Sequence, residues 1–167
     1  MANGQGGVKW EDCNFWLYSG ALGIGFGKLI SVTEMRGNVM SALDIVHQHH
    51  NSINAKDERQ YLDSLNFPFT YQNYNGVSIT IKNQDDYQNN YRMPWDIIKD
   101  TEPNWSHTEL DEIEEVARST SSLVFKLLAR RINKSGNTDL VIQMIWIAVS
   151  AQGEWGIKFR HNLGTPL

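Results

Sequence analysis

The sequence predicts an α+β domain in which an antiparallel sheet, built from hairpins, carries two or three helices on one face. Two patterns support this class. Some stretches have apolar residues at alternate positions and are joined by glycine-containing turns, which is typical of hairpins. Others have apolar residues every three or four positions, which is typical of helices. Hairpins separated by helices favour α+β over a parallel α/β arrangement.

The length and composition are those of one globular domain spanning 1–167, with 41% hydrophobic and 20% charged residues. We expect residues 1–9 to form a flexible arm. The net charge of −4 argues against nucleic acid as the main partner, because proteins that bind its backbone usually carry a basic face. The single cysteine, Cys13, excludes an intrachain disulfide.

A glycine-rich apolar segment follows the arm. Apolar residues and glycines alternate over 20–32, which predicts a buried strand with one glycine face, preceded by a short strand at 14–18. The alternative is a membrane-active segment, 10–32, that leaves the fold to insert into a bilayer. A phosphate-binding loop is excluded, because Leu22 and Leu29 stand where that motif needs glycine and a hydroxyl residue.

Two helices are expected next. Apolar residues at helical spacing predict the first from Thr33 or Glu34 to about Ser52. Asn54 and Asp57 both have the spacing of an N-cap for a shorter helix over 55–65.

A hairpin is predicted from 67–73 and 77–82. A three-residue loop at 74–76, with Gly76 in the left-handed conformation, would pair Tyr71 with Ile79 and Phe69 with Ile81. A two-residue turn would place these residues on opposite faces. The three-residue loop is preferred because it keeps the apolar side chains together.

One long helix is predicted at about 107–133. Ser106 and Glu109 have capping-box spacing, acidic residues follow in the first turns, and basic residues crowd the last turns. Its weak point is the Ser119–Ser122 patch, where we expect a bend. Beyond it, 139–150 favours a central strand over a helix, because it is apolar on both faces and rich in Ile and Val, although the pattern leaves the helix open. Gln152-Gly153 predicts a turn, and 154–161 a second strand with Trp155, Ile157 and Phe159 on one face.

The best candidate for a binding surface is an aromatic, amide-rich loop over 83–105. Tyr, Trp and Arg are enriched among the residues that dominate protein interfaces. The candidate contact residues are Tyr87, Tyr91, Arg92, Trp95 and Trp105. The competing interpretation is that these aromatic residues fold back over the core.

Sequence motifs give little support for catalysis. No nucleophile motif occurs, and no cofactor is expected. His47 and His50 share one helical face and are a weak alternative as metal ligands, although histidine near a helix C-terminus also complements the helix dipole. We therefore do not predict a metal site.

These observations favour a non-enzymatic module that binds another protein or itself, such as a structural subunit, an adaptor or an inhibitor. Membrane insertion through 10–32 is the first alternative, and a small hydrolase or metal-dependent enzyme is the second. No signal peptide or membrane-spanning helix is evident, so an intracellular or cytoplasmic location is expected.

Overall fold

The computed structural model describes residues 40–167. The arm at 1–9, the strands predicted at 14–18 and 20–32, and the membrane-active alternative at 10–32 all lie outside this range. The described elements are α1 (Ala42–Ala55), α2 (Glu58–Asp63), β1 (Leu65–Asn73), β2 (Ser78–Ile81), α3 (Gln84–Asn90), α4 (Pro94–Thr101), β3 (Trp105–Arg118), β4 (Ser122–Asn133), β5 (Thr138–Ala151) and β6 (Glu154–Gly164). No helix within 40–167 is long and apolar enough to span a membrane.

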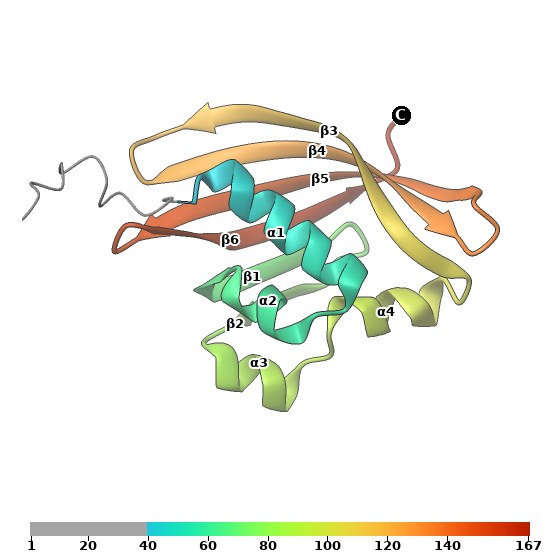
Figure 1. The fold of residues 1–167 in the computed structure, drawn as a ribbon, viewed down its shortest axis with the longest axis horizontal. Coiled ribbons are helices and arrows are strands. Elements are labelled where there is room, and N and C mark those ends of the chain that lie inside the picture. The colour runs from blue at the N-terminus through green and yellow to red at the C-terminus, as the bar shows by residue number, and fades with distance from the viewer. Residues whose placement is uncertain (1–39) are drawn as a thin grey trace, which may run out of the picture. The chain divides into compact units, whose positions relative to one another are not determined.

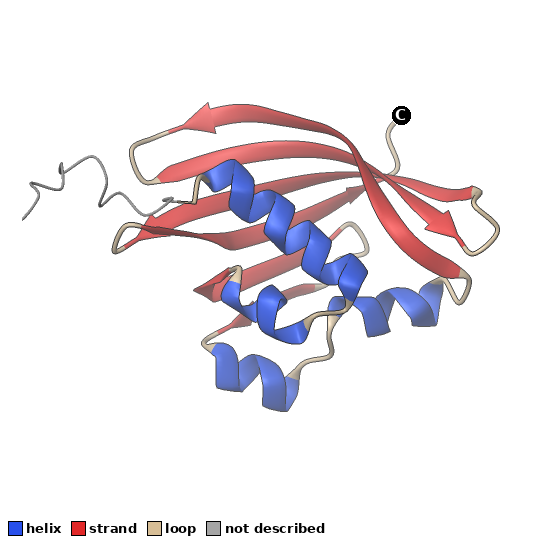
Figure 2. Ribbon diagram, in the orientation of Figure 1, coloured by secondary structure: helices blue, strands red, loops and turns tan. Residues whose placement is uncertain are grey.

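The strands form one six-stranded sheet in the order β2-β1-β6-β5-β4-β3. The helices pack on a single face of it, as Figures 1 and 2 show. The predicted α+β class is confirmed. Two details differ. The described residues contain four helices rather than two or three, and β1 pairs with β6 in parallel whereas every other neighbouring pair is antiparallel.

The starts of helices α1 and α2 are fixed by their N-cap residues. Ser41 and Asp44 form a reciprocal capping box, so α1 begins at Ala42. The single helix predicted from Thr33 or Glu34 to about Ser52 is therefore not continuous, since the chain is not helical at Met40 and Ser41, while 33–39 lie outside the described residues. The shorter helix predicted over 55–65 begins later than expected, because Ala55 is the last residue of α1. Asp57 caps α2 by accepting a hydrogen bond from the amide of Gln60, so that helix begins at Glu58.

The hairpin of β1 and β2 has the predicted register. Tyr71 pairs with Ile79 and Phe69 pairs with Ile81. Gly76 has a φ of 89°, which a residue with a side chain rarely adopts. The turn chemistry and the need to keep the apolar face together therefore identify the same pairing.

The long helix predicted at 107–133 is wrong. The segment forms the antiparallel strands β3 and β4, and the Ser119–Ser122 patch is the turn between them rather than a bend. Leu123, Phe125 and Leu127 are all buried at alternate positions of β4. A spacing of four residues fits both the helical period and twice the strand period, so the pattern did not separate the two structures.

The charge order that resembled dipole complementation has a different cause. Acidic residues lie on β3, and basic residues lie beside them on β4. Arg130 contacts both Glu109 and Asp111 at 2.8 Å, and Lys126 lies 3.6 Å from Glu114. These are cross-strand ion pairs, which stabilise strand pairing. Ser106 and Glu109 lie in β3 and form no capping box.

The segment 83–105, predicted as a loop, contains two short helices. Asn83 caps α3 through the amide of Asp86, and Pro94 occupies the first turn of α4. Tyr87 in α3 is buried, although most of its neighbours in 83–92 are exposed. In Figure 1, α3 lies beneath β2, whereas α4 lies beside the bent end of β3, which follows it in the chain.

The sheet curves around its helical layer. The register of β3 with β4 shifts at three places, and such irregularities bend and twist the strand that contains them. The buried core lies between this concave face and the helices, with Val46, Phe69, Leu127 and Trp146 among its buried members. The predicted strands at 139–150 and 154–161 are confirmed as β5 and β6, joined by a turn at Gln152 and Gly153. The single face predicted for Trp155, Ile157 and Phe159 is wrong, because a register shift puts Ile157 and Phe159 on opposite faces of β6.

Candidate functional site

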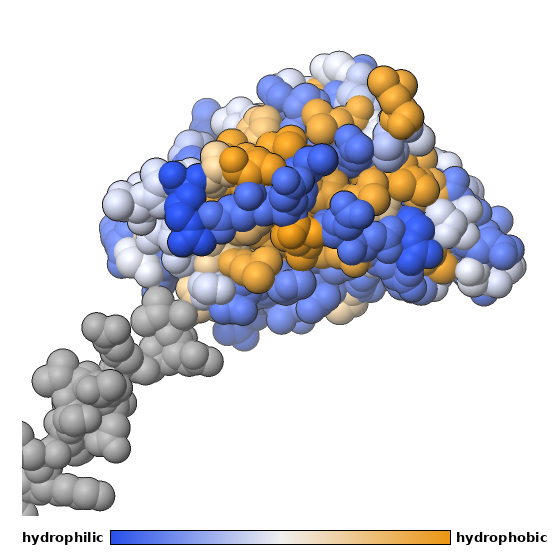
Figure 3. Space-filling model, turned by 90° about the horizontal axis from the view of Figure 1, so that it is seen from above, coloured by the Kyte–Doolittle hydropathy of each residue, from blue (hydrophilic) through white to orange (hydrophobic). Residues whose placement is uncertain are grey.

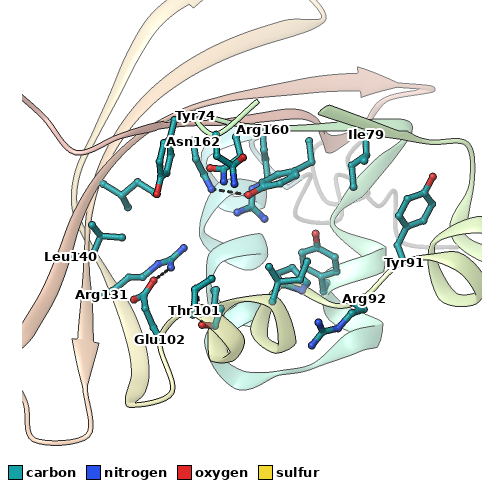
Figure 4. A pocket seen from close by; sticks show the side chains of 18 of the residues that line it. Tyr74, Ile79, Tyr91, Arg92, Thr101, Glu102, Arg131, Leu140, Arg160 and Asn162 are labelled. Atoms are coloured by element: carbon teal, nitrogen blue, oxygen red, sulfur yellow. Dashed lines mark hydrogen bonds and ion pairs between the residues drawn. The ribbon is translucent and has the colours of Figure 1, made fainter. Parts of the chain in front are cut away.

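A cavity of about 420 Å³ lies between the sheet and the helices α3 and α4. Most of its wall is apolar. Aromatic rings and aliphatic side chains from β1, β2, α3, α4 and β5 contribute to it, among them Phe69, Tyr71, Ile79, Tyr87, Tyr91, Ile98, Leu140 and Ile142. Figure 4 shows Arg160 and Asn162 entering the cavity from β6, with Arg131 and Glu102 at one end and Tyr91 and Arg92 at the other.

Arg160 is a cation almost removed from solvent, with 7% of its surface exposed. Its Nη1 donates a hydrogen bond to Nε2 of His49 at 3.0 Å. The guanidinium carbon lies 4.8 Å from the centre of the Trp146 ring and 5.8 Å from that of Tyr71. Aromatic faces attract cations, so these rings offset part of the loss of hydration.

His49 connects Arg160 to the helical layer. The ring is fully buried, and its Nδ1 lies 2.7 Å from the hydroxyl of Ser64. That hydroxyl donates to the carbonyl of Tyr61, so it accepts the proton on Nδ1 of His49. Nε2 is then the acceptor that Arg160 requires. Burial first, and then the positive charge of Arg160, hold the pKa of His49 well below its usual range, which keeps the imidazole neutral.

Two tyrosine hydroxyls and an amide add fixed polar groups. The hydroxyls of Tyr61 and Tyr87 lie 3.1 Å apart, and burial raises the pKa of both, so both stay protonated. Asn162 donates from Nδ2 to the hydroxyl of Tyr71 at 3.0 Å. The cavity therefore presents neutral hydrogen-bonding groups next to one buried cation.

Several polar atoms of the lining residues are buried without a hydrogen-bond partner. They are Asn73 Oδ1, Glu102 Oε2, Arg160 Nε and Asn162 Oδ1. Buried polar atoms are normally paired, and exceptions are often found at functional sites. Their presence in one cavity distinguishes it from ordinary core packing.

The structure places the five predicted contact residues in two groups. Tyr87, Tyr91 and Arg92 line the cavity, and Arg92 is exposed at its edge. Trp95 and Trp105 are buried in the core and do not line it. Whether any of the five contacts a protein partner stays a prediction.

The two histidines named as weak metal ligands are not brought together with other ligands. His47 is exposed, whereas His50 is buried and accepts a hydrogen bond from the side chain of Asn54 at 3.2 Å. Within residues 40–167, no three His, Cys, Asp or Glu side chains are grouped as a metal site would require.

Sequence reasoning missed Arg160, because strict alternation along 154–161 puts it on the face opposite Ile157. The pairing with β5 shifts between Ile157 and Phe159, so the chain gains one residue there. This irregularity returns Arg160 and Asn162 to the buried face that Ile157 already occupies.

Comparisons with known proteins establish the fold. No family model and no curated protein matches the sequence. A protein of unknown function with a cystatin-like fold from Nostoc punctiforme is 13% identical, with a TM-score of 0.58 over 77% of this chain and 96% of that one. A candidate ketosteroid isomerase from Shewanella frigidimarina is 14% identical, with a TM-score of 0.54 over 75% and 97% of the two chains.

A third similar structure, a variant of the protein named Rd1NTF2_05, is 11% identical, with a TM-score of 0.53 over 72% of this chain and 95% of that one. Identities this low carry no information about activity. The shared arrangement of a curved, mostly antiparallel six-stranded sheet with helices on one face identifies the fold of this chain as NTF2-like.

Proposed function

We propose that this protein binds a small organic molecule with an apolar body in the cavity between the sheet and α3–α4. The observation that carries this proposal is the cavity itself, about 420 Å³ lined by rings and aliphatic side chains around a few fixed polar groups. Sites for small molecules have this size and composition.

The hydrogen bonds and ion pairs that the polar groups in and behind the cavity wall already form favour binding over catalysis. Glu102 is the one carboxylate among the lining residues, and it forms an ion pair with Arg131. The acceptor nitrogen of His49 already receives a hydrogen bond from Arg160. A general base needs a free acceptor within reach of its substrate, and His49 has none. Oε2 of Glu102 has no hydrogen-bond partner, but the carboxylate is held by its ion pair with Arg131.

A matched pair of substitutions tests the location of the site. Leu140→Trp enlarges a side chain that lines the cavity, whereas Leu163→Trp makes the same change on β6 at a position that is 44% exposed and outside the lining. The neutral fluorophore N-phenylnaphthylamine serves as the probe, and fluorescence titration measures its dissociation constant. We expect Leu140→Trp to weaken binding at least about tenfold because it fills the site, and Leu163→Trp to leave it unchanged.

Equal affinity in both variants would contradict the proposal, and so would a wild-type protein that does not bind the probe. Circular dichroism and thermal melting of each variant show whether lost binding reflects a filled cavity or a lost fold.

Protein binding or self-association is a second candidate, supported by the face of the sheet opposite the helices. The residues on this face of β4, β5 and β6 include Val124, Ile147 and Phe159, which are half-buried and lie side by side in the register. Figure 3 shows hydrophobic side chains reaching the surface among hydrophilic ones in the view from above. Contiguous exposed apolar surface is a common mark of an interaction site.

Sedimentation velocity tests this second candidate. If the chain associates with itself through this face, Ile147→Lys is expected to shift the population to monomer, because it puts a charge into the interface. A wild-type protein that is monomeric at every concentration would contradict self-association. Membrane insertion through 10–32 and an enzyme that uses His47 and His50 stay untested predictions.

A further inference from the structure

We propose that the occupant of the cavity is a carboxylate anion whose head group pairs with Arg160. This inference rests on the proposed small-molecule function and specifies the chemical class of the ligand. It follows from a comparison of the arginines that line the cavity.

Three arginines line the cavity, and two of them are already neutralised. Arg92 forms an ion pair with Asp100 at 2.5 Å, and Arg131 pairs with Glu102. Within the described part of the chain, no carboxylate forms an ion pair with Arg160. The cavity therefore contains one positive charge without a negative partner.

This charge is also the most deeply buried of the three. The side chain of Arg131 is 14% exposed and that of Arg92 is 59% exposed, whereas Arg160 as a whole residue is only 7% exposed. A buried charge is costly unless it is paired, and a neutral imidazole with two aromatic rings offsets that cost only in part. An anion in the cavity would supply the missing charge in a site where electrostatic attraction is weakly screened.

The chemistry of the group favours a carboxylate. A guanidinium is planar and binds the two oxygens of a carboxylate with parallel hydrogen bonds. Nη1 of Arg160 is bonded to His49, while Nε has no partner. A single unpaired cation matches a single negative charge, and the remaining lining matches an apolar, ring-containing body. The neutral hydroxyls of Tyr61 and Tyr87 add donors without adding charge.

The test compares two ligands that differ in charge but share one body. Naphthoate and naphthamide displace N-phenylnaphthylamine from the wild-type protein at neutral pH, and the titrations give the two inhibition constants. We expect naphthoate to bind at least about tenfold more tightly than naphthamide, because only the carboxylate pairs with Arg160. This comparison needs no variant, so it does not depend on how a substitution affects folding.

Variants then assign the preference to one residue. Arg160→Met is expected to remove the preference for naphthoate. Arg160→Lys is expected to retain part of this preference, because lysine keeps the charge but not the planar donor pair. Arg59→Met is the matched control, since the side chain of Arg59 is 93% exposed on α2 and does not line the cavity.

The outcomes separate this inference from the proposed function. If the probe binds in the cavity but naphthamide displaces it as well as naphthoate does, the carboxylate inference is wrong and the proposed function stands. A preference for naphthoate that persists in Arg160→Met also overturns the inference. If the probe does not bind the wild-type protein in the cavity, the proposed function itself fails.

Discussion

Between neutral pH and about pH 4, the free energy of unfolding is expected to fall by at least roughly 3 kcal/mol. The cause is the pair of buried histidines in α1. Burial lowers the pKa of His50 from 6.5 to about 4, and it lowers that of His49 well below 6.5. Both imidazoles are therefore neutral in the folded protein at pH values where they are charged in the unfolded chain.

The sign of the effect follows from proton uptake. Below pH 6.5 the unfolded chain binds protons that the folded protein does not, so acid favours unfolding. The contribution of the neutral, buried histidines to the free energy of unfolding is fully present above about pH 6.5. It is lost as the pH falls through the folded-state pKa of His50, about 4. Urea unfolding curves at a series of pH values measure it directly.

Two histidines on the same helix provide the comparison. His50→Gln is expected to flatten the pH dependence, because glutamine keeps polar atoms beside Asn54 without titrating. His47→Gln is expected to leave it unchanged, since His47 is exposed. A stability that is the same at both ends of the pH range, or a slope that His50→Gln does not change, would show that burial of these histidines does not control acid unfolding.

Trp146→Ala is expected to destabilise the protein by about 3–5 kcal/mol. Trp146 is 1% exposed at the centre of β5, with its ring edge-on to that of His49 at 5.0 Å and beneath the guanidinium of Arg160 at 4.8 Å. Alanine would leave a large cavity under both groups and remove the aromatic face that stabilises the buried cation. Chemical denaturation measures the loss.

Two further variants make this prediction specific. Trp155→Ala removes the same side chain from a half-buried position near the β5–β6 turn and is expected to have a clearly smaller effect. Trp146→Phe is also expected to be milder, because Nε1 of Trp146 has no hydrogen-bond partner to lose. The idea that Trp146 supports the site fails if Trp146→Ala and Trp155→Ala are equally stable.

The parts of the fold that local chemistry determines were predictable from the sequence. The β1–β2 register followed from Gly76 and from the alternation of Phe69 and Tyr71, and both signals lie within fifteen residues of chain. The strand at 139–150 was recognisable because it is apolar on both faces and rich in Ile and Val. In each case propensity and packing pointed to the same structure.

The prediction of a long helix at 107–133 was wrong because a helix and a hairpin both satisfy the same local pattern. Acids followed by bases complement a helix dipole, but they also pair across a hairpin, as Glu109 and Arg130 do. Deciding between them requires knowing that β5 is available to pair with β4, which is a tertiary fact. Propensity is a weak guide where tertiary pairing competes with it.

Most of the candidate site could not be predicted from the sequence for the same reason. Tyr87, Tyr91 and Arg92 were noticed for their residue types, and they do line the cavity. Arg160 and His49 were not noticed, because their proximity joins positions 111 residues apart in the chain. The shift in β6 that turns Arg160 inward is a feature of its pairing with β5, and no sequence period encodes it.

The parallel pairing of β1 with β6 has a consequence for how the protein folds. The β1–β2 hairpin joins the rest of the sheet through β6, the last strand in the chain, so the sheet cannot be completed until that strand is available. On the ribosome, α1 through β5 would wait with the edges of β1 and β5 unpaired, which are templates for misassociation. Such distant contacts place the chain among slow folders, with folding times of about milliseconds to seconds. Completion of the cavity, which needs Arg160 and Asn162 from β6, is then a late event in folding.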